Sequence, residues 1–67
     1  MSTIKVIEVL AQSSKGWEDA AVTALESAQR TVRNVQSIYI KEMTANVEDG
    51  KIASYRINAK ISFALDE

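Results

Sequence analysis

Arg56 and Lys60 are the two residues of this 67-residue sequence whose chemistry and spacing best suit an anion. They lie four positions apart in a segment where polar and apolar residues alternate, so in a β-strand both side chains would project from the same polar face. An arginine guanidinium binds a phosphate or carboxylate through two parallel hydrogen bonds. Glu42, in the preceding segment, is the acidic residue that could neutralise the two cations instead. The sequence therefore leaves two interpretations open: ion pairing with Glu42, or a site for an anionic ligand.

Ligands for a hard cation would have to be acidic side chains, because the sequence contains no histidine and no cysteine. Calcium binds about six to eight oxygen atoms, and the spacing of the acidic residues matches no EF-hand loop. We therefore assign no metal ligands within one chain. An oligomer offers another route, because a symmetry axis brings several copies of one carboxylate together. The candidates for such a site are Glu8, Glu42, Glu48, Asp49, Asp66 and Glu67.

The same two absences exclude most catalytic chemistry. Without histidine or cysteine, the usual pairs of nucleophile and general base cannot be formed. The two glycines, Gly16 and Gly50, lie too far apart in the sequence for a phosphate-binding loop. We expect a protein that is not an enzyme, and the remote alternative is a reaction carried by Tyr39, Glu42 or Arg56.

Charge and hydropathy exclude two classes of partner. The 8 basic residues are balanced by 9 acidic ones and form no run, so the basic patch of a nucleic-acid-binding protein is absent. No apolar segment approaches the ~18 residues of a transmembrane helix, and the first ten residues carry charges where a signal peptide would be apolar. We therefore expect a cytoplasmic protein that binds neither nucleic acid nor a membrane.

Residues 51–65 form the segment that must position Arg56 and Lys60, and their alternation predicts one long β-strand. At ~3.3 Å per residue this strand spans roughly 50 Å, whereas a compact chain of this length is about 28 Å across. The strand must extend beyond its own globule or curl strongly, and its apolar face then needs cover. Because so short a chain is marginally stable alone, we expect another copy of the chain to supply that cover. The apolar face is formed by Ala53, Tyr55, Ile57, Ala59, Ile61, Phe63 and Leu65.

Two further strands are predicted, and with them a single domain over residues 1–67. Residues 3–11 and 35–47 are rich in β-branched and aromatic residues, which are typical of strands. The pair Asp49-Gly50 predicts a tight hairpin between the last two strands. The sequence thus predicts an α+β fold of the order β-α-β-β, with a three-stranded antiparallel sheet wrapped on one helix.

The helix is predicted for residues 17–33, where apolar residues recur at spacings of three and four. Its first residue is Trp17, which lies on the apolar stripe and is expected to pack as a core or interface anchor. Arg30 and Arg33 are placed in the last turn, where cations favour the helix dipole. Asn34 follows and is expected to end the helix, since asparagine tolerates the left-handed conformation.

The order of these elements and several short motifs resemble the dodecin family over essentially the whole chain. The resemblance implies a hollow dodecamer of cubic symmetry, with the helices outside and the sheets facing the interior. Such an assembly would cover the apolar face of the long strand and leave its polar face lining a wet interior. The segments that carry the resemblance are Lys5-Val6-Ile7-Glu8, Trp17-Glu18-Asp19-Ala20-Ala21, Thr31-Val32-Arg33-Asn34-Val35, Asp49-Gly50-Lys51-Ile52 and Ser62-Phe63-Ala64-Leu65-Asp66.

The resemblance also implies a flavin site, and this sequence departs from it. Well-known dodecins hold pairs of flavins with a tryptophan just after the helix and a glutamine in the last strand. Those positions are occupied here by Ser37 and Arg56, with Tyr39 on the same strand face as Ser37. A serine cannot stack on a flavin ring, and such stacking is worth roughly 1–3 kcal/mol per ring by analogy with nucleobases. The cofactors left open by the resemblance are therefore a weakly bound flavin or a divalent cation such as calcium, the latter from the dodecins that lack the tryptophan.

We predict from these features a non-catalytic dodecameric shell, built from copies of this chain, that binds or stores a small ligand or ion. Two alternatives stay open: a weak flavin-binding dodecin and a purely structural shell without a ligand. The predicted ligand-binding positions are Ser37, Tyr39 and Arg56. Glu42 and Lys60 are predicted to form a charged site on the inner face.

Overall fold

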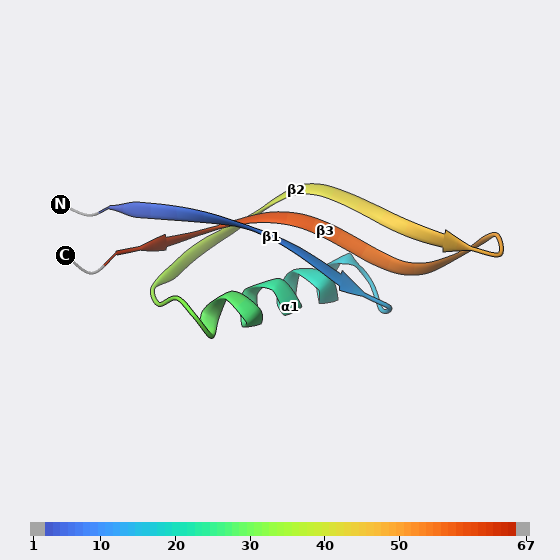
Figure 1. Cartoon of the computed structure of the whole chain (residues 1–67), viewed down its shortest axis with the longest axis horizontal. Helices are drawn as coiled ribbons and strands as arrows, with labels where there is room; N and C mark the ends of the chain where they lie inside the picture. The colour runs from blue at the N-terminus through green and yellow to red at the C-terminus, as the bar shows by residue number, and fades with distance from the viewer. Residues whose placement is uncertain (1–2, 66–67) are drawn as a thin grey trace.

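The computed structural model describes residues 3–65 and has the predicted element order β-α-β-β (Figure 1). Strands β1 (Ile4–Ser13), β2 (Val35–Glu48) and β3 (Lys51–Ala64) form one antiparallel sheet in the order β1-β3-β2. Helix α1 (Trp17–Gln29) lies across one face of this sheet. The predicted three-stranded antiparallel sheet with one helix is confirmed, and the last strand of the chain is its central strand.

The chain is elongated, with principal extents of 52 × 19 × 13 Å and a Cα radius of gyration of 13.8 Å. A compact chain of this length would have a radius of gyration of about 11 Å. Much of the excess length comes from the β2–β3 hairpin, because β1 pairs with β3 only as far as the Ser13–Tyr55 pair. Residues 46–54, which we call the hairpin arm, continue past the start of α1 as two strands (Figure 1). The prediction that the long strand extends beyond its own globule is confirmed.

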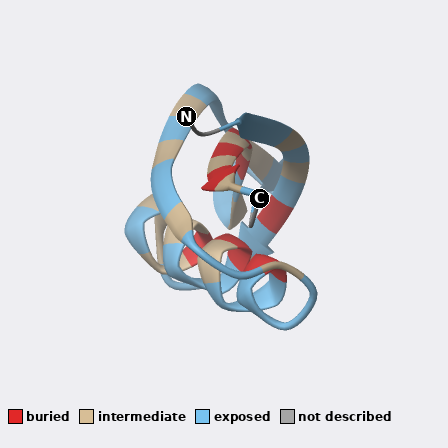
Figure 2. Ribbon diagram, turned by 90° about the vertical axis from the view of Figure 1, so that its left-hand side faces the viewer, coloured by how far each residue is buried: buried red, intermediate tan, exposed pale blue. Residues whose placement is uncertain are grey.

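The core lies between α1 and the middle of the sheet, and its helical side is made of small residues. Ala20, Ala24 and Ala28 are buried at four-residue spacing, which places them on one face of α1 (Figure 2). They pack against the buried face of β3, where Ile57 and Ile61 are the largest fully buried side chains. Because alanine adds so little bulk, the helix approaches the sheet closely. The alternation of β3 thus sets which of its residues are buried, as the sequence predicts.

The helix ends at Gln29, so the predicted helix over residues 17–33 is four residues too long. The reason lies in the carbonyl of Ala28, which accepts from the amides of Thr31 and Val32 at 3.0 Å and from the Thr31 hydroxyl at 3.2 Å. The two Thr31 bonds span three residues instead of four, which tightens the end of the helix, and the β-branched residues Thr31 and Val32 do not continue it. Arg30 caps the helix, and its last turn contains no basic residue, contrary to the prediction. Asn34 does adopt the predicted left-handed conformation, with φ 62°, but it turns the chain into β2.

The hairpin forms at the predicted pair, since Asp49 (φ 51°) and Gly50 (φ 76°) are both left-handed, as a type I′ turn requires. A register shift between Asn46 and Val47 precedes the turn. This shift pairs Ile52 with Val47, and it explains why Ile52 interrupts the polar set of the long strand. The hairpin arm therefore carries an exposed apolar pair near its tip.

We expect the change Gly50→Ala to lower the free energy of unfolding by roughly 1–2 kcal/mol, because only glycine adopts a positive φ without steric cost. Denaturant unfolding at fixed protein concentration measures the loss. Gly16→Ala is the matched control, since Gly16 is extended (φ 162°) and a Cβ there would meet nothing within 4 Å. Equal effects of the two substitutions would show that the turn conformation at Gly50 is not under this constraint.

Candidate functional site

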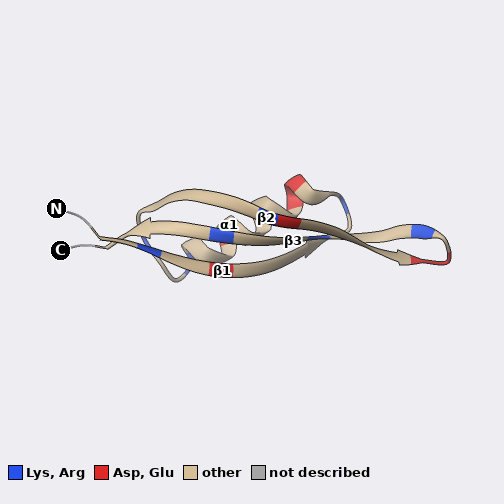
Figure 3. Cartoon of the chain, turned by 90° about the horizontal axis from the view of Figure 1, so that it is seen from above, with Lys and Arg blue, Asp and Glu red and all other residues tan. Residues whose placement is uncertain are grey.

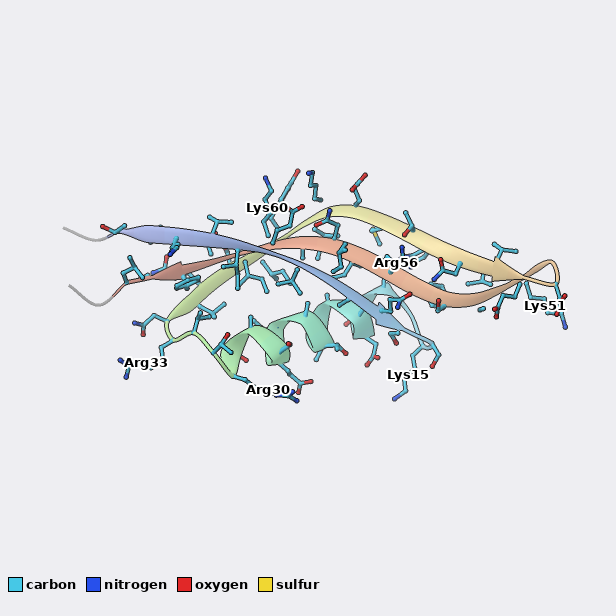
Figure 4. All side chains as sticks on the ribbon, viewed as in Figure 1. Lys15, Arg30, Arg33, Lys51, Arg56 and Lys60 are labelled. Carbon is cyan, nitrogen blue, oxygen red and sulfur yellow. The ribbon has the colours of Figure 1, made fainter. Side chains whose placement is uncertain are left out.

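All five predicted site residues lie on the sheet face that points away from α1. The register shows this directly, because cross-strand partners share a face and the partners on the other face are the buried core residues. Ser37 is opposite Ser62, Tyr39 is opposite Lys60, and Glu42 is opposite Asn58, the residue between Lys60 and Arg56 on this face. Figure 4 shows Lys60 projecting from the side of the sheet opposite the helix. We call this surface the open face.

The two positions that correspond to the family's flavin site are not brought together within one chain. Ser37 pairs with Ser62, whereas Arg56 pairs with Thr44, six residues further along β3. At ~3.3 Å per residue this separates the two positions by roughly 20 Å. A ligand that touches both positions would have to be held by two copies of the chain.

Tyr39 is the aromatic residue nearest to Ser37 on the open face, and its side chain is 62% exposed. Its cross-strand neighbour is Lys60, and an ammonium group can contact the face of such a ring. Trp17, by contrast, belongs to the helix side of the sheet. Its Nε1 donates to the carbonyl of Thr44 at 2.9 Å, and its ring meets that of Tyr55 edge-on with centroids 4.8 Å apart. Trp17 therefore anchors the start of α1 to β2 and β3 and contributes no ring to the open face.

Acidic and basic residues are interspersed along the three strands rather than gathered by sign, as the colouring of the ribbon in Figure 3 shows. Glu8 is opposite Lys60 in the register, but its carboxylate forms an ion pair with Lys41 at 3.7 Å. Glu42 accepts a hydrogen bond from the amide of Asn58 at 3.4 Å. Within residues 3–65 no carboxylate oxygen lies within 4 Å of the charged nitrogens of Arg56 or Lys60. The ion pairing of these cations with Glu42 therefore stays a prediction for assembled chains.

Arg56 is held by residues that sequence reasoning missed. Its Nη2 donates to Oε1 of Gln12 on β1 at 3.3 Å. The same oxygen accepts from Nδ2 of Asn46 at 3.1 Å, and Nδ2 of Asn46 also donates to the Ser54 hydroxyl at 2.7 Å. These side chains come from all three strands, and Gln12 is 44 residues from Arg56 in the sequence. No local motif signals the cluster; only the pairing of β1 with β3 brings Gln12 opposite Arg56.

Metal-binding chemistry has no preformed site in the part of the chain that the structure describes. No group of three or more acidic side chains in residues 3–65 is close enough to hold a metal ion. Glu8 and Glu42 are engaged with Lys41 and Asn58, and Glu48 and Asp49 lie at the hairpin turn. The remaining candidates, Asp66 and Glu67, lie outside the described residues. Residues 3–65 of one chain thus present no set of acidic side chains arranged to hold calcium.

A cavity of about 210 Å³ lies between the second half of α1 and the start of the edge strand β2, where Ser37, a residue of the open face, also contributes to its wall. No ionisable side chain contributes to its wall, so it is unsuited to an ion. The lining residues are Leu25, Gln29, Val35, Gln36, Ser37 and Ile38.

Fold and open face together define a class of small α+β proteins in which one helix covers one side of a long, curved sheet and leaves the other side bare. Within residues 3–65, no helix has the length and apolar character needed to cross a membrane. The family model for dodecins matches residues 3–66. The chain belongs to the dodecin family.

Two relatives extend this assignment. The calcium dodecin of Mycobacterium tuberculosis is 31% identical over 65 residues, which cover 97% of this chain and 92% of the relative. The dodecin of Thermus thermophilus is 27% identical over 63 residues, which cover 94% of this chain and 91% of the relative. The similarity thus spans nearly the full length of both proteins.

Solved dodecin structures share the fold of this chain, but backbone similarity and sequence identity favour different relatives. The dodecin of Streptomyces coelicolor superposes with a TM-score of 0.93 at 29% identity, covering 98% of this chain and 94% of that one. The M. tuberculosis calcium dodecin, described as a calcium-chelating antigen with a novel calcium-binding site, gives 0.83 at 33% identity, covering 97% and 93%. The backbone is therefore closer to the Streptomyces dodecin, while the sequence is closer to the calcium dodecin. This disagreement means that overall similarity does not identify the ligand of this chain.

Proposed function

We propose that this chain assembles into a hollow dodecamer that binds a small ligand without catalysing a reaction. The observation that carries the proposal is the exposure of apolar side chains on both faces of the sheet and on the hairpin arm of a single chain. Its buried core contains few large side chains, with Ile57 and Ile61 the largest that are fully buried. The exposed set on the strands is larger and comprises Ile4, Val6, Leu10, Tyr39, Met43, Val47 and Ile52.

So much exposed apolar surface favours association, because each fully buried Val, Leu or Ile side chain contributes roughly 1.5–3 kcal/mol. Membership of the dodecin family supports twelve copies as the closed form. Light scattering tests the assembly directly: we expect a mass about twelve times the 7.4 kDa of the chain. A stable monomer at micromolar concentration would overturn the proposal.

The absence of a catalytic role is supported by the composition and by the open face. The chain has neither histidine nor cysteine, and on the open face Glu8 pairs with Lys41, while Glu42 and Arg56 bond to the amides of Asn58 and Gln12. An empty shell with a purely structural role is the alternative. Ligand titrations of the assembled protein distinguish it from a binding shell.

Neither cofactor suggested by the relatives fits residues 3–65 of one chain. Ser37 occupies the position where a flavin needs a stacking ring, and no group of three acidic side chains in residues 3–65 could hold calcium. We therefore propose that any flavin binds weakly and that any calcium is held between chains.

The flavin part of this proposal predicts that the protein quenches riboflavin fluorescence poorly. The double change Ser37→Trp with Arg56→Gln should restore tight binding, because each added ring supplies roughly 1–3 kcal/mol of stacking. A fluorescence titration measures both affinities, and Ser62→Trp serves as a control that adds an indole opposite Ser37 but outside the family's position. Nanomolar binding by the unmodified protein would contradict the prediction.

A further inference from the structure

We propose that the open face carries an oxyanion site, formed by Arg56 with Gln12, Thr44, Asn46 and Ser54, which we call the Arg56 cluster. This inference rests on the proposed ligand-binding shell and names the chemical class of its ligand as a phosphate or carboxylate group. The cluster lies where the three-stranded sheet gives way to the hairpin arm, with Gln12 and Thr44 directly opposite Arg56 on either side. In Figure 4, Arg56 lies on β3 near this point, away from the other labelled cations.

The hydrogen bonds within the cluster use the NH₂ group of Asn46 and the Oε1 of Gln12, and they leave donors on Gln12, Ser54, Thr44 and Arg56 without a partner in residues 3–65. Oε1 of Gln12 accepts from both Arg56 and Asn46, so this oxygen must face them, and the NH₂ group of Gln12 points elsewhere. That group donates to no residue in the range 3–65. The Ser54 hydroxyl accepts from Asn46, which leaves its own proton to donate. The Thr44 hydroxyl and the other N–H groups of Arg56 are likewise unused within the described chain.

The Arg56 cluster also carries a positive charge that no acidic side chain of residues 3–65 neutralises. Arg56 is bound by a neutral amide and by no carboxylate of residues 3–65. The nearest acidic residue in the register is Glu42, which is opposite Asn58 and accepts from its amide. In a shell whose interior is lined by this face, copies of Arg56 without a counter-charge would repel one another. An anion at Arg56 removes that repulsion.

The cross-strand row next to Arg56 on the open face, which contains Asn58 and Glu42, does not suit an anion. The proposed site is therefore restricted to the row of Arg56. Asn58 donates to Glu42, and its Oδ1 is a buried acceptor with no hydrogen-bond partner in residues 3–65. A carboxylate and an unpaired acceptor would both repel an oxyanion. The row formed by Gln12, Arg56 and Thr44 offers donors instead, and it is fixed on three paired strands, which hold a site more rigidly than loops do.

The geometry of the donors suits a group with two or three oxygens. The planar guanidinium can bind two oxygens in parallel, as with phosphate and carboxylate groups. Thr44 lies directly opposite Arg56 on β2, and Ser54 precedes it by two residues on the same face of β3. Their hydroxyls can donate to the remaining oxygen of a phosphate. Inorganic phosphate and pyrophosphate are therefore the probes for one source, and citrate is the probe for a carboxylate.

The test is a calorimetric and thermal-shift titration of the assembled protein with each probe, against sodium chloride of equal ionic strength. We expect a saturable rise in melting temperature and a measurable heat of binding, with affinity falling at least about tenfold in Arg56→Gln. Arg56→Lys keeps the charge but loses the planar fork, so it should weaken binding by less. Lys51→Gln removes a cation from the hairpin tip and is the matched control, expected to bind as the wild type does.

Three results would overturn the oxyanion site. They are no saturable response to any probe, an equal response in Arg56→Gln and wild type, or an equal loss in Lys51→Gln. If Glu42→Gln alone lowers the melting temperature of the assembly and no probe acts, a carboxylate of a neighbouring copy is the counter-charge and the site is refuted. Light scattering on the same samples keeps the two proposals apart: a monomer refutes the shell, whereas an intact assembly without anion binding refutes only the site.

Discussion

The variant Val47→Asp is expected to lose the native assembly while keeping its own helix and strands. Val47 is 64% exposed in the single chain and pairs with Ile52 on the hairpin arm, so the substitution disturbs little inside the chain. If this arm is covered by another copy, the aspartate buries an unpaired charge, which costs several kcal/mol per ion and recurs in every copy. Light scattering should show a drop from about twelve chains to a small oligomer or monomer, with circular dichroism unchanged in shape.

Thr23→Asp is the matched control for this prediction, because Thr23 lies on the exposed side of α1 and gains the same charge. Its mass in solution should equal that of the wild type. Should Val47→Asp fail to fold, Leu10→Asp tests the same idea on the open face, where Leu10 is also exposed. An unchanged mass in both variants would exclude these apolar surfaces from the assembly contacts.

The variant Ile61→Ala is expected to show the largest loss of stability among single truncations. Ile61 is fully buried (0% exposed) and lies opposite Ile7 on β1 and Ile38 on β2, beneath the alanines of α1. Removing its side chain loses burial and leaves a cavity, at a cost of about 2–5 kcal/mol, a large share of the stability of so small a chain. Chemical denaturation at fixed protein concentration measures this loss, and Ile61→Val should give an intermediate value of about 0.5–1.5 kcal/mol.

Val22→Ala provides the comparison on an exposed position, since Val22 lies on the solvent side of α1. Alanine is the better helix former, so this truncation should be neutral or slightly stabilising. If Ile61→Ala lowers the free energy of unfolding no more than Val22→Ala does, the packing around Ile61 does not stabilise the core as proposed.

The sequence predicted most of the fold because the informative patterns are local. Alternation over β3 predicts a strand and divides its residues into a buried and a polar face, since side chains in a strand point to opposite sides in turn. Asp49 and Gly50 predict the hairpin because few other residues adopt two consecutive left-handed conformations. The predicted end of α1 was wrong because the helix closes through hydrogen bonds from Thr31 and Val32 to the Ala28 carbonyl. The spacing of apolar residues carries no information about these bonds.

The candidate site was predicted only in part, for a different reason. Alternation assigns Ser37 and Tyr39 to one face of β2, and Arg56 and Lys60 to one face of β3. It would place Glu42 on the opposite face from Tyr39, and only the register shift between Ile40 and Glu42 brings Glu42 to the open face. The partners of these residues could not be assigned, because partners depend on register and strand order. The Glu8–Lys41 ion pair reaches from β1 to β2 across the central strand, and the pairing of Glu42 with Asn58 places it between the two cations rather than against either one.

By itself, the sequence determined the type of each element, the hairpin, the faces of the long strand and the need for association, since each follows from periodicity, residue conformation or chain length. Only the tertiary structure decided that β3 is central and that Gln12 holds Arg56. These outcomes depend on contacts between residues more than forty positions apart. The central position of β3 gives it two neighbours, so the same alternation that buries its apolar side against α1 brings its polar side between donors from β1 and β2. That arrangement, which no single segment encodes, is the physical basis of the proposed oxyanion site.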